Sequence, residues 1–301
     1  FNLAISVFRV PVMSLMPDQT PKEHWSTANG IVNFMGGIGA LIAYFLGSML
    51  FEKGRVYPFL MTAVLLLVCL LLLRIFVKER ETVTEGSSGE TETEIKVRLG
   101  EAFLGLLRKE QRTNRCILLS IFFRFVGYNG VETFFALYLM NLHNLGSGKA
   151  GIFLGILALS FIITAIPSGI LGEKLGRRRS VLMGLLFMTG VFILDAATGS
   201  FTVMLISAPL GGFGYALVNI NAFPFLLENA PAGNTGTYTG LYYFFFSLAS
   251  IIAPPFFGKL MDLFGMGILF HISTVMLVLA VISFLFIPKG VKQQGGVEHV
   301  S

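Results

Sequence analysis

The chain has 301 residues, of which 54% are hydrophobic and 13% charged, and its mean hydropathy is +0.76. So apolar a composition excludes a soluble globular domain and favours several helices inside a lipid bilayer. The net charge of +5 does not indicate a nucleic-acid partner, because the basic residues are confined to a few segments between apolar stretches. Cys69 and Cys116 lie too far apart for a metal-ligand pair, so we expect structural thiols and no metal site.

Nine apolar stretches are long enough, or nearly so, to span a bilayer as helices, which takes about 20 residues each. They cover residues 1–16, 27–50, 57–77, 116–142, 150–171, 180–200, 201–227, 237–260 and 266–287. The first stretch is short and begins without a methionine or a charged segment. We therefore expect it to be the end of a helix whose start is absent, and not a signal peptide.

Lysine and arginine are distributed unevenly between alternate loops of this predicted bundle. One side of the membrane collects 16 of the 22 basic residues and the other side 4, while Arg9 and Arg124 lie inside predicted spans. Basic residues accumulate on the cytoplasmic side of multi-pass proteins. The richer side, which includes the central linker and the C-terminus, is therefore expected to be cytoplasmic.

The polar segment 78–114 is expected to be a cytoplasmic linker between two groups of helices. Residues 85–94 are Gly, Ser, Thr and Glu, a composition that cannot bury itself in a core. Apolar side chains between residues 99 and 107 then recur at helical spacing among basic residues, which is typical of an amphipathic helix on the inner leaflet. A plain charged linker helix is the alternative.

An internal repeat relates the two ends of the chain. A shift of 210 positions without gaps aligns Thr27 with Thr237 and Gly30 with Gly240, among other similar pairs. Transporters commonly duplicate a helical unit and bind the substrate between the two halves near the middle of the bilayer. The repeat therefore predicts two related helical bundles.

The segment from Gly169 to Arg179 combines three glycines, an acid and a cluster of basic residues between two apolar stretches. The glycines allow a tight turn and close helix packing, and the bases favour the cytoplasmic side. This pattern resembles the helix-connecting signature of the major facilitator superfamily of secondary transporters. Because the repeat places its counterpart before Phe1, the resemblance implies helices four to twelve of twelve, with the first three helices missing.

Residues 9–21, 28–39 and 230–243 resemble bacterial members of the sucrose-transporter branch of that superfamily. The branch implies symport of protons with a disaccharide or oligosaccharide, such as sucrose or maltose, by a carrier of the plasma or inner membrane. We expect a monomer without a cofactor, and sodium is an alternative coupling ion. The chain departs from the bacterial pattern at Trp25, where a basic residue is usual.

The predicted fold is thus an all-α membrane protein of major facilitator superfamily architecture with about nine transmembrane helices. The expected parts are residues 1–77 (three helices of the N-terminal bundle), 78–114 (linker), 115–288 (six-helix C-terminal bundle) and 289–301 (cytoplasmic tail).

Two arginines inside predicted spans are candidates for the substrate or proton pathway. Arg9 lies eight residues before Pro17, about 12 Å along a helix, and hence near mid-membrane. A charge at that depth marks a pathway or, as the alternative, a buried structural pair. Arg124 lies within another span, and its alternative role is to extend towards the inner leaflet as an anchor.

Arg124, Tyr128 and Glu132 are spaced four residues apart and therefore share one helical face, with Asn129 adjacent. A low-dielectric cavity disfavours an ionised carboxyl group, whereas a nearby guanidinium restores it. Movement of Arg124 could thus load or release a proton at Glu132, and this face is the predicted coupling site.

Amide and phenol side chains supply the predicted sugar ligands. Asn219, Asn221 and Tyr215 lie close together on one predicted helix, and the repeat pairs Asn219 with Arg9. Amides match sugar hydroxyl groups because both donate and accept hydrogen bonds, and aromatic rings such as Tyr242 and Tyr243 stack on the apolar side of a sugar. Hydrogen bonding between helices is the alternative role of the asparagines.

A separate group of residues is expected to act as a gate. Glu173 either caps the helix that starts near Ser26 or pairs with bases of the opposite half when the cytoplasmic side closes. A purely topological role is the alternative for the arginines. The predicted gate consists of Asp18, Gly169, Glu173, Lys174, Gly176, Arg177, Arg178, Arg179 and Glu228.

These features predict a carrier that imports a sugar with protons by alternating access and catalyses no bond change. An exporter of drugs or metabolites is one alternative, although the asparagines in the spans argue against a purely aromatic cavity. A sugar sensor that binds without transport is the second. An intramembrane enzyme is disfavoured, because the spans contain no paired aspartates, serine-lysine dyad or spaced histidine pair.

Overall fold

The computed structural model describes residues 15–17, 19–54, 56–76, 111–144, 147–231 and 234–288. Nearly all of the first predicted span, most of the linker and the C-terminal tail lie outside these ranges. The same holds for Arg9 and Asp18, so their predicted roles stay predictions.

The described chain is helical, with short turns between helices and no strands in these ranges. The helices are α2 (Trp25–Lys53), α3 (Tyr57–Phe76), α5 (Arg112–Leu142), α6 (Ser147–Leu175), α7 (Arg177–Thr198), α8 (Phe201–Glu228), α9 (Thr235–Phe264) and α10 (Leu269–Leu285), with short 3-10 helices η1 (Lys22–His24) and η3 (Met266–Ile268). Each helix from α2 to α10 coincides with a predicted apolar stretch. The all-α prediction is therefore confirmed.

Among the described residues, five segments are long and apolar enough to cross a membrane by length and composition alone: Gly155–Leu175, Arg177–Thr198, Phe201–Glu228, Thr235–Phe264 and Met266–Leu285. They belong to α6 through α10. Helix α5 is longer than most of them but is not among the five, because its charged and amide side chains lower its hydropathy. Three of those side chains, Arg124, Asn129 and Glu132, belong to the predicted coupling site.

The chain divides into two compact units, residues 1–34 with 102–301, and residues 35–101. The second unit contains the later part of α2 and all of α3, and α3 is apolar around almost its whole circumference, as expected of a helix in lipid. The predicted domain boundaries at residues 77 and 114 stay a prediction.

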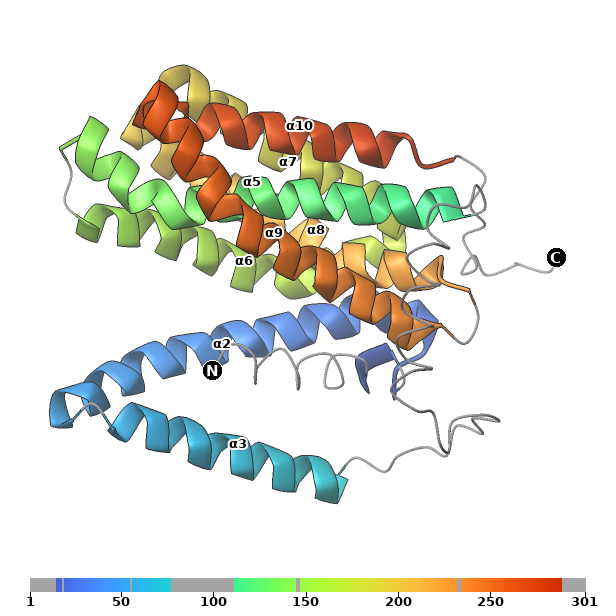
Figure 1. Ribbon diagram of the computed structural model, residues 1–301. Coiled ribbons are helices and arrows are strands. Elements are labelled where there is room, and N and C mark those ends of the chain that lie inside the picture. The colour runs from blue at the N-terminus through green and yellow to red at the C-terminus, as the bar shows by residue number, and fades with distance from the viewer. Residues whose placement is uncertain are drawn as a thin grey trace. The chain divides into compact units, whose positions relative to one another are not determined.

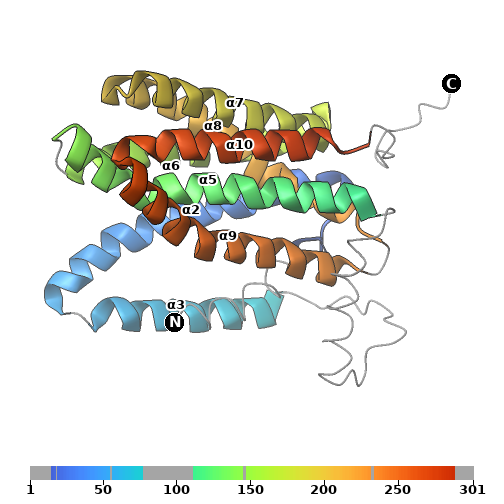
Figure 2. The ribbon, with the colours of Figure 1, turned by 45° about the horizontal axis from the view of Figure 1, so that its top comes forward.

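Within the first unit, α5 to α10 pack side by side as a bundle (Figures 1 and 2). The closest neighbours are α7 with α8, α6 with α8, and α5 with both α9 and α10. Small residues let α7 and α8 approach, since a Cβ atom on Gly184 would lie 2.6 Å from the carbonyl oxygen of Gly214. Phe135, Leu139 and Phe270 belong to the buried core between the helices.

Helix boundaries keep the spacing of the sequence repeat. Helix α9 begins at Thr235, 210 residues after α2 begins at Trp25. The end of α10 at Leu285 follows the end of α3 at Phe76 by almost the same interval. This agreement supports the inference of two related helical halves.

Candidate substrate cavity and gate

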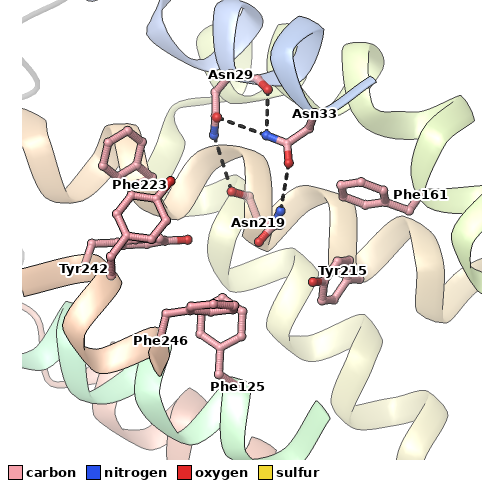
Figure 3. Close-up of a pocket in the computed structure, with 10 residues that line it drawn as sticks. Asn29, Asn33, Phe125, Phe161, Tyr215, Asn219, Phe223, Tyr242 and Phe246 are labelled. Atoms are coloured by element: carbon pink, nitrogen blue, oxygen red, sulfur yellow. Dashed lines mark hydrogen bonds between the residues drawn. The ribbon is translucent and has the colours of Figure 1, made fainter. Parts of the chain in front are cut away.

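A cavity of about 240 Å³ lies within the first unit, where α2 meets helices of the C-terminal bundle (Figure 3). Its lining residues are amides, phenols and phenylalanines, and none of them is charged. They are Asn29, Asn33, Phe125, Phe161, Tyr215, Asn219, Phe223, Tyr242, Tyr243 and Phe246. Helices α2, α5, α6, α8 and α9 each contribute at least one of them.

Three asparagines form a hydrogen-bonded cluster on one side of this cavity. Asn29 donates to the carbonyl oxygen of Ile220 at 2.7 Å, which ties α2 to α8. Asn33 donates to the side-chain oxygen of Asn29 at 3.0 Å, and Asn219 donates to the side-chain oxygen of Asn33 at 3.3 Å (Figure 3). The amides thus join two helices that are far apart in the sequence, and they do so at the cavity surface.

Aromatic rings form the rest of the wall. Phe125 of α5 packs edge-to-face on Phe246 of α9, with ring centroids 4.6 Å apart. Phe161 of α6 packs in the same way on Tyr215 of α8 at 5.3 Å. Rings held by such contacts offer a rigid apolar surface beside the amides.

Four of the predicted ligand residues, Tyr215, Asn219, Tyr242 and Tyr243, lie at this cavity, whereas Asn221 does not. The buried amide of Asn221 donates to the carbonyl oxygen of Ser168 on α6 at 3.0 Å. Its place in the pathway stays a prediction. In this structure it makes the hydrogen bond between helices that was the alternative, and it does not line the cavity. The reason is that two positions along a helix turn a side chain by about 200°, so Asn219 and Asn221 face opposite ways.

Arg124 is completely buried, with an exposed fraction of 0%. Its guanidinium carbon lies 3.7 Å from the centre of the Phe125 ring and 5.2 Å from that of Tyr215. The alternative of a side chain extending to the leaflet surface is therefore wrong. The three guanidinium nitrogens have no hydrogen-bond acceptor among the described residues.

The other members of the predicted coupling face do not pair with Arg124. The ring of Tyr128 stacks on Tyr215 with centroids 4.4 Å apart. Glu132 lines a second, narrower cavity together with Tyr128, and Asn129 donates to the hydroxyl oxygen of Ser250 at 3.0 Å. Whether this face couples ion movement to transport stays a prediction.

Sequence reasoning did not single out Asn29 and Asn33 as ligands, although both line the cavity. The available signal was the spacing of two amides by four residues in an apolar span, which puts them on one face. Phe125, Phe161 and Phe246 carried no signal of this kind, because 30 phenylalanines are spread along the chain.

A charged cluster joins the start of α2 to the turn between α6 and α7. Arg177 forms an ion pair with Glu228 at 3.4 Å and donates from Nε to the hydroxyl oxygen of Ser26 at 3.0 Å. A further hydrogen bond runs from Arg177 to the carbonyl oxygen of Lys22. This side of the molecule is the one predicted to be cytoplasmic.

Glu173 caps α2, which is the first of the two roles that the sequence left open. Its carboxylate accepts a hydrogen bond of 2.8 Å from the backbone N–H of Thr27, where the first N–H groups of the helix lack partners of their own. His24 lies 3.8 Å from the other carboxylate oxygen. An acid at the end of α6 therefore fixes the start of a helix that lies 146 residues earlier in the chain.

Each glycine of the Gly169–Arg179 segment is favoured at its position for a different structural reason. A Cβ atom on Gly169 would lie 2.6 Å from the carbonyl oxygen of Ser26, so only glycine allows α6 to approach α2 this closely. A Cβ atom on Gly172 would overlap the Asn221 side chain at 1.7 Å. Gly176 has a φ of 90°, a backbone conformation that favours glycine and makes the turn into α7.

The remaining basic residues of the segment do not join the cluster around Arg177. Arg178 donates to the carbonyl oxygens of Ile287 and Pro288 at 2.7 and 2.9 Å, and so holds the end of α10. Lys174 and Arg179 are exposed.

The sequence profile of the Major Facilitator Superfamily matches residues 2–166 and again 117–299, which together cover almost the whole chain. The chain belongs to the major facilitator superfamily. It is accordingly a multi-pass membrane protein of all-helical fold.

Known relatives agree with this assignment. The chain is 29% identical over 150 residues to the uncharacterized MFS-type transporter C18.02 of Schizosaccharomyces pombe. The match covers 49% of this chain and 34% of that protein, so it reaches only about a third of the relative's length.

Two crystal structures of FucP share the fold. The fucose:proton symporter FucP of E. coli superimposes with a TM-score of 0.70 at 15% identity, over 92% of this chain and 72% of FucP. FucP in the outward conformation gives a TM-score of 0.71 at 14% identity, over 92% and 71% of the two chains. At this identity the likeness shows the fold alone.

Proposed function

We propose that this member of the superfamily is a secondary transporter that carries a disaccharide or oligosaccharide together with protons by alternating access. The observation that carries the proposal is the cavity itself, where three amides face an aromatic wall at the meeting of α2 with the C-terminal helices. A site between the two halves of a duplicated bundle is where such transporters bind their substrates.

The chemistry of the lining fits a sugar. Each asparagine offers an acceptor oxygen and a two-hydrogen donor, which suits hydroxyl groups that do both. The phenol and phenyl rings suit the apolar side of a sugar ring. An exporter of apolar drugs would not need hydrogen-bonding groups such as Asn33 and Asn219 at its cavity, so the lining favours the sugar carrier.

Proton coupling is proposed on two grounds. Helix α5 holds a carboxyl group, Glu132, at a cavity within the span. In addition, the fold is shared with a protein whose solved structure is named a fucose:proton symporter. The finer proposal, a carrier of the sucrose-transporter branch in the plasma or inner membrane with its linker and C-terminus in the cytoplasm, rests on the sequence blocks and the distribution of basic residues.

The gate is proposed to be the cluster around Arg177. Its ion pair with Glu228 and the Glu173 cap hold α2 against α6 to α8 on the predicted cytoplasmic side. Opening towards the cytoplasm must break these contacts, so their strength would set the balance between the two states.

The decisive experiment measures proton uptake in vesicles that contain the protein as its gene encodes it. Addition of sucrose or maltose is expected to make the outer medium more alkaline, because protons enter with the sugar. Absence of alkalinisation with every glycoside would reject proton-coupled sugar transport. Sugar uptake driven only by a sodium gradient would identify sodium as the coupling ion. Sugar binding without counterflow exchange would identify a sensor.

A further inference from the structure

We infer that the sugar bound in this cavity carries a carboxylate, and that Arg124 of α5 binds that group. The inference rests on the proposed function, since it takes a sugar to be the ligand, and it narrows the substrate class from glycosides in general to sugar acids.

The first ground is the uncompensated charge of Arg124. The side chain is fully buried in a membrane protein, yet Nε, Nη1 and Nη2 have no acceptor among the described residues. A buried cation is tolerated only if an anion or several acceptors compensate its lost hydration. Contact with the faces of Phe125 and Tyr215 supplies part of that compensation but leaves the N–H groups without acceptors.

The acids of the described helices that lie nearest the core, and the exposed Glu132 of α5, do not supply the missing anion. Glu228 pairs with Arg177, Glu173 caps α2, and Asp195 accepts a hydrogen bond from Ser207 at the contact of α7 with α8. Glu132 follows Arg124 by eight residues on the same helix, about 12 Å along its axis, which is too far for a direct pair. No acid of the described residues pairs with Arg124, so we take its partner to be an anion that the substrate brings.

The second ground is the contact of the guanidinium with the cavity wall. Phe125 and Tyr215, the two rings in contact with it, both line the cavity. The five N–H donors of a guanidinium lie in its plane, along its edges. That planar edge is the geometry that binds a carboxylate through two parallel hydrogen bonds.

The third ground is the register of α8. Asn219 and Tyr215 are one helical turn apart, and both side chains face the cavity in Figure 3. A sugar ring bonded to Asn219 and stacked on Tyr215 would lie against a ring whose centre is 5.2 Å from the guanidinium carbon of Arg124. The amides would then form hydrogen bonds with the hydroxyl groups of the sugar, and Arg124 would bind its carboxylate.

A matched pair of sugars tests the inference, namely maltose and maltobionate, in which one end of the same disaccharide is oxidised to a carboxylic acid that is ionised at neutral pH. Binding of each is measured on the purified protein as its gene encodes it, in wild type and in Arg124→Gln, Arg124→Lys and Lys259→Gln. The last variant removes an exposed positive charge on α9, away from the cavity.

We expect wild type to bind maltobionate at least about tenfold more tightly than maltose, a difference of about 1.4 kcal/mol. Arg124→Gln should abolish that preference while maltose affinity changes little, and Lys259→Gln should keep it. Arg124→Lys should retain part of it, because lysine keeps the charge but not the paired geometry.

Equal binding of the two sugars by wild type, or a preference for maltose, would overturn the inference and leave sugar transport standing. An equal loss of both sugars in the Arg124 variants would assign the arginine a structural role. If wild type bound neither these two sugars nor any other glycoside, the proposed function itself would fail. The comparison of maltose with maltobionate on the wild-type protein tests the inference even if an Arg124 variant does not fold.

Discussion

The side chains of Asn33 and Asn219 meet at the cavity surface, where their hydrogen bond of 3.3 Å is longer than most. An amide that holds its neighbour weakly can exchange that bond for a sugar hydroxyl group at little cost. Asn29, with its bond of 2.7 Å to the carbonyl oxygen of Ile220, is held more firmly and is 2% exposed. At the scale of the residue, Asn33 and Asn219 are therefore the expected ligands, and Asn29 positions them.

Replacement of either ligand asparagine by alanine is expected to weaken sugar binding. Asn33→Ala and Asn219→Ala should each raise the dissociation constant about five- to tenfold, the effect of one lost hydrogen bond of about 1 kcal/mol. The double variant should lose less than the sum, because the two side chains share a bond. Titration calorimetry on the purified protein measures these values.

Asn141→Ala is the matched control, since Asn141 is an exposed asparagine of α5 bonded to its own helix. Unchanged affinity in both single variants would show that the amide cluster only joins α2 to α8.

At the scale of the element, close contact between helices depends on glycine at defined positions. Helix α6 illustrates this, because Gly169 faces the backbone of α2 and Gly172 faces the Asn221 side chain of α8. Gly155 on the same helix has no atom within 4 Å of its hypothetical Cβ. The same residue type therefore has different importance along one helix, according to what lies opposite.

Gly172→Ala should destabilise the protein, whereas Gly155→Ala should not. Overpacking at a close contact costs about 1 to 3 kcal/mol, while alanine is a better helix former than glycine where space is free. Thermal unfolding in detergent compares the two variants. Adding Asn221→Ala to Gly172→Ala should recover part of the loss, and equal stability of the Gly155 and Gly172 variants would contradict the observed packing.

For the whole molecule, the proposed orientation in the membrane rests on the distribution of the basic residues. The turn between α5 and α6 is poor in them, whereas the turn between α6 and α7 carries a cluster. Chain order places these two turns on opposite sides of the bilayer, and the positive-inside rule assigns the second to the cytoplasm.

Labelling of single cysteines checks this orientation. In a variant with Cys69→Ser and Cys116→Ser, a cysteine replacing exposed Asn144 should react with a membrane-impermeant maleimide applied to intact cells. A cysteine replacing exposed Arg179 should react only after the cells are opened. The reverse pattern would invert the proposed topology and the direction of the gate.

Part of the site was predictable, and the reason differs from residue to residue. Glu173 was predictable as a cap because an acid next to a helix-connecting turn meets the partial positive charge at a helix start. The sequence could not show which of Asn219 and Asn221 lines the cavity, since composition does not reveal which face of α8 is turned towards it. The lack of an acceptor for Arg124 among the described residues could not be predicted either, because it depends on which side chains pack near the guanidinium.

The positions of the described helices, their expected sidedness and the family pattern of the Gly169–Arg179 turn could be predicted from the amino-acid sequence. These properties are local, because a run of apolar residues must bury its backbone hydrogen bonds in a helix whatever its neighbours are. Only the tertiary structure decided that Asn29 and Asn33 join Asn219 at one cavity, that Asn221 faces α6 and that Arg124 contacts the aromatic wall. These are contacts between helices, and they depend on helix rotation and packing that no single segment contains.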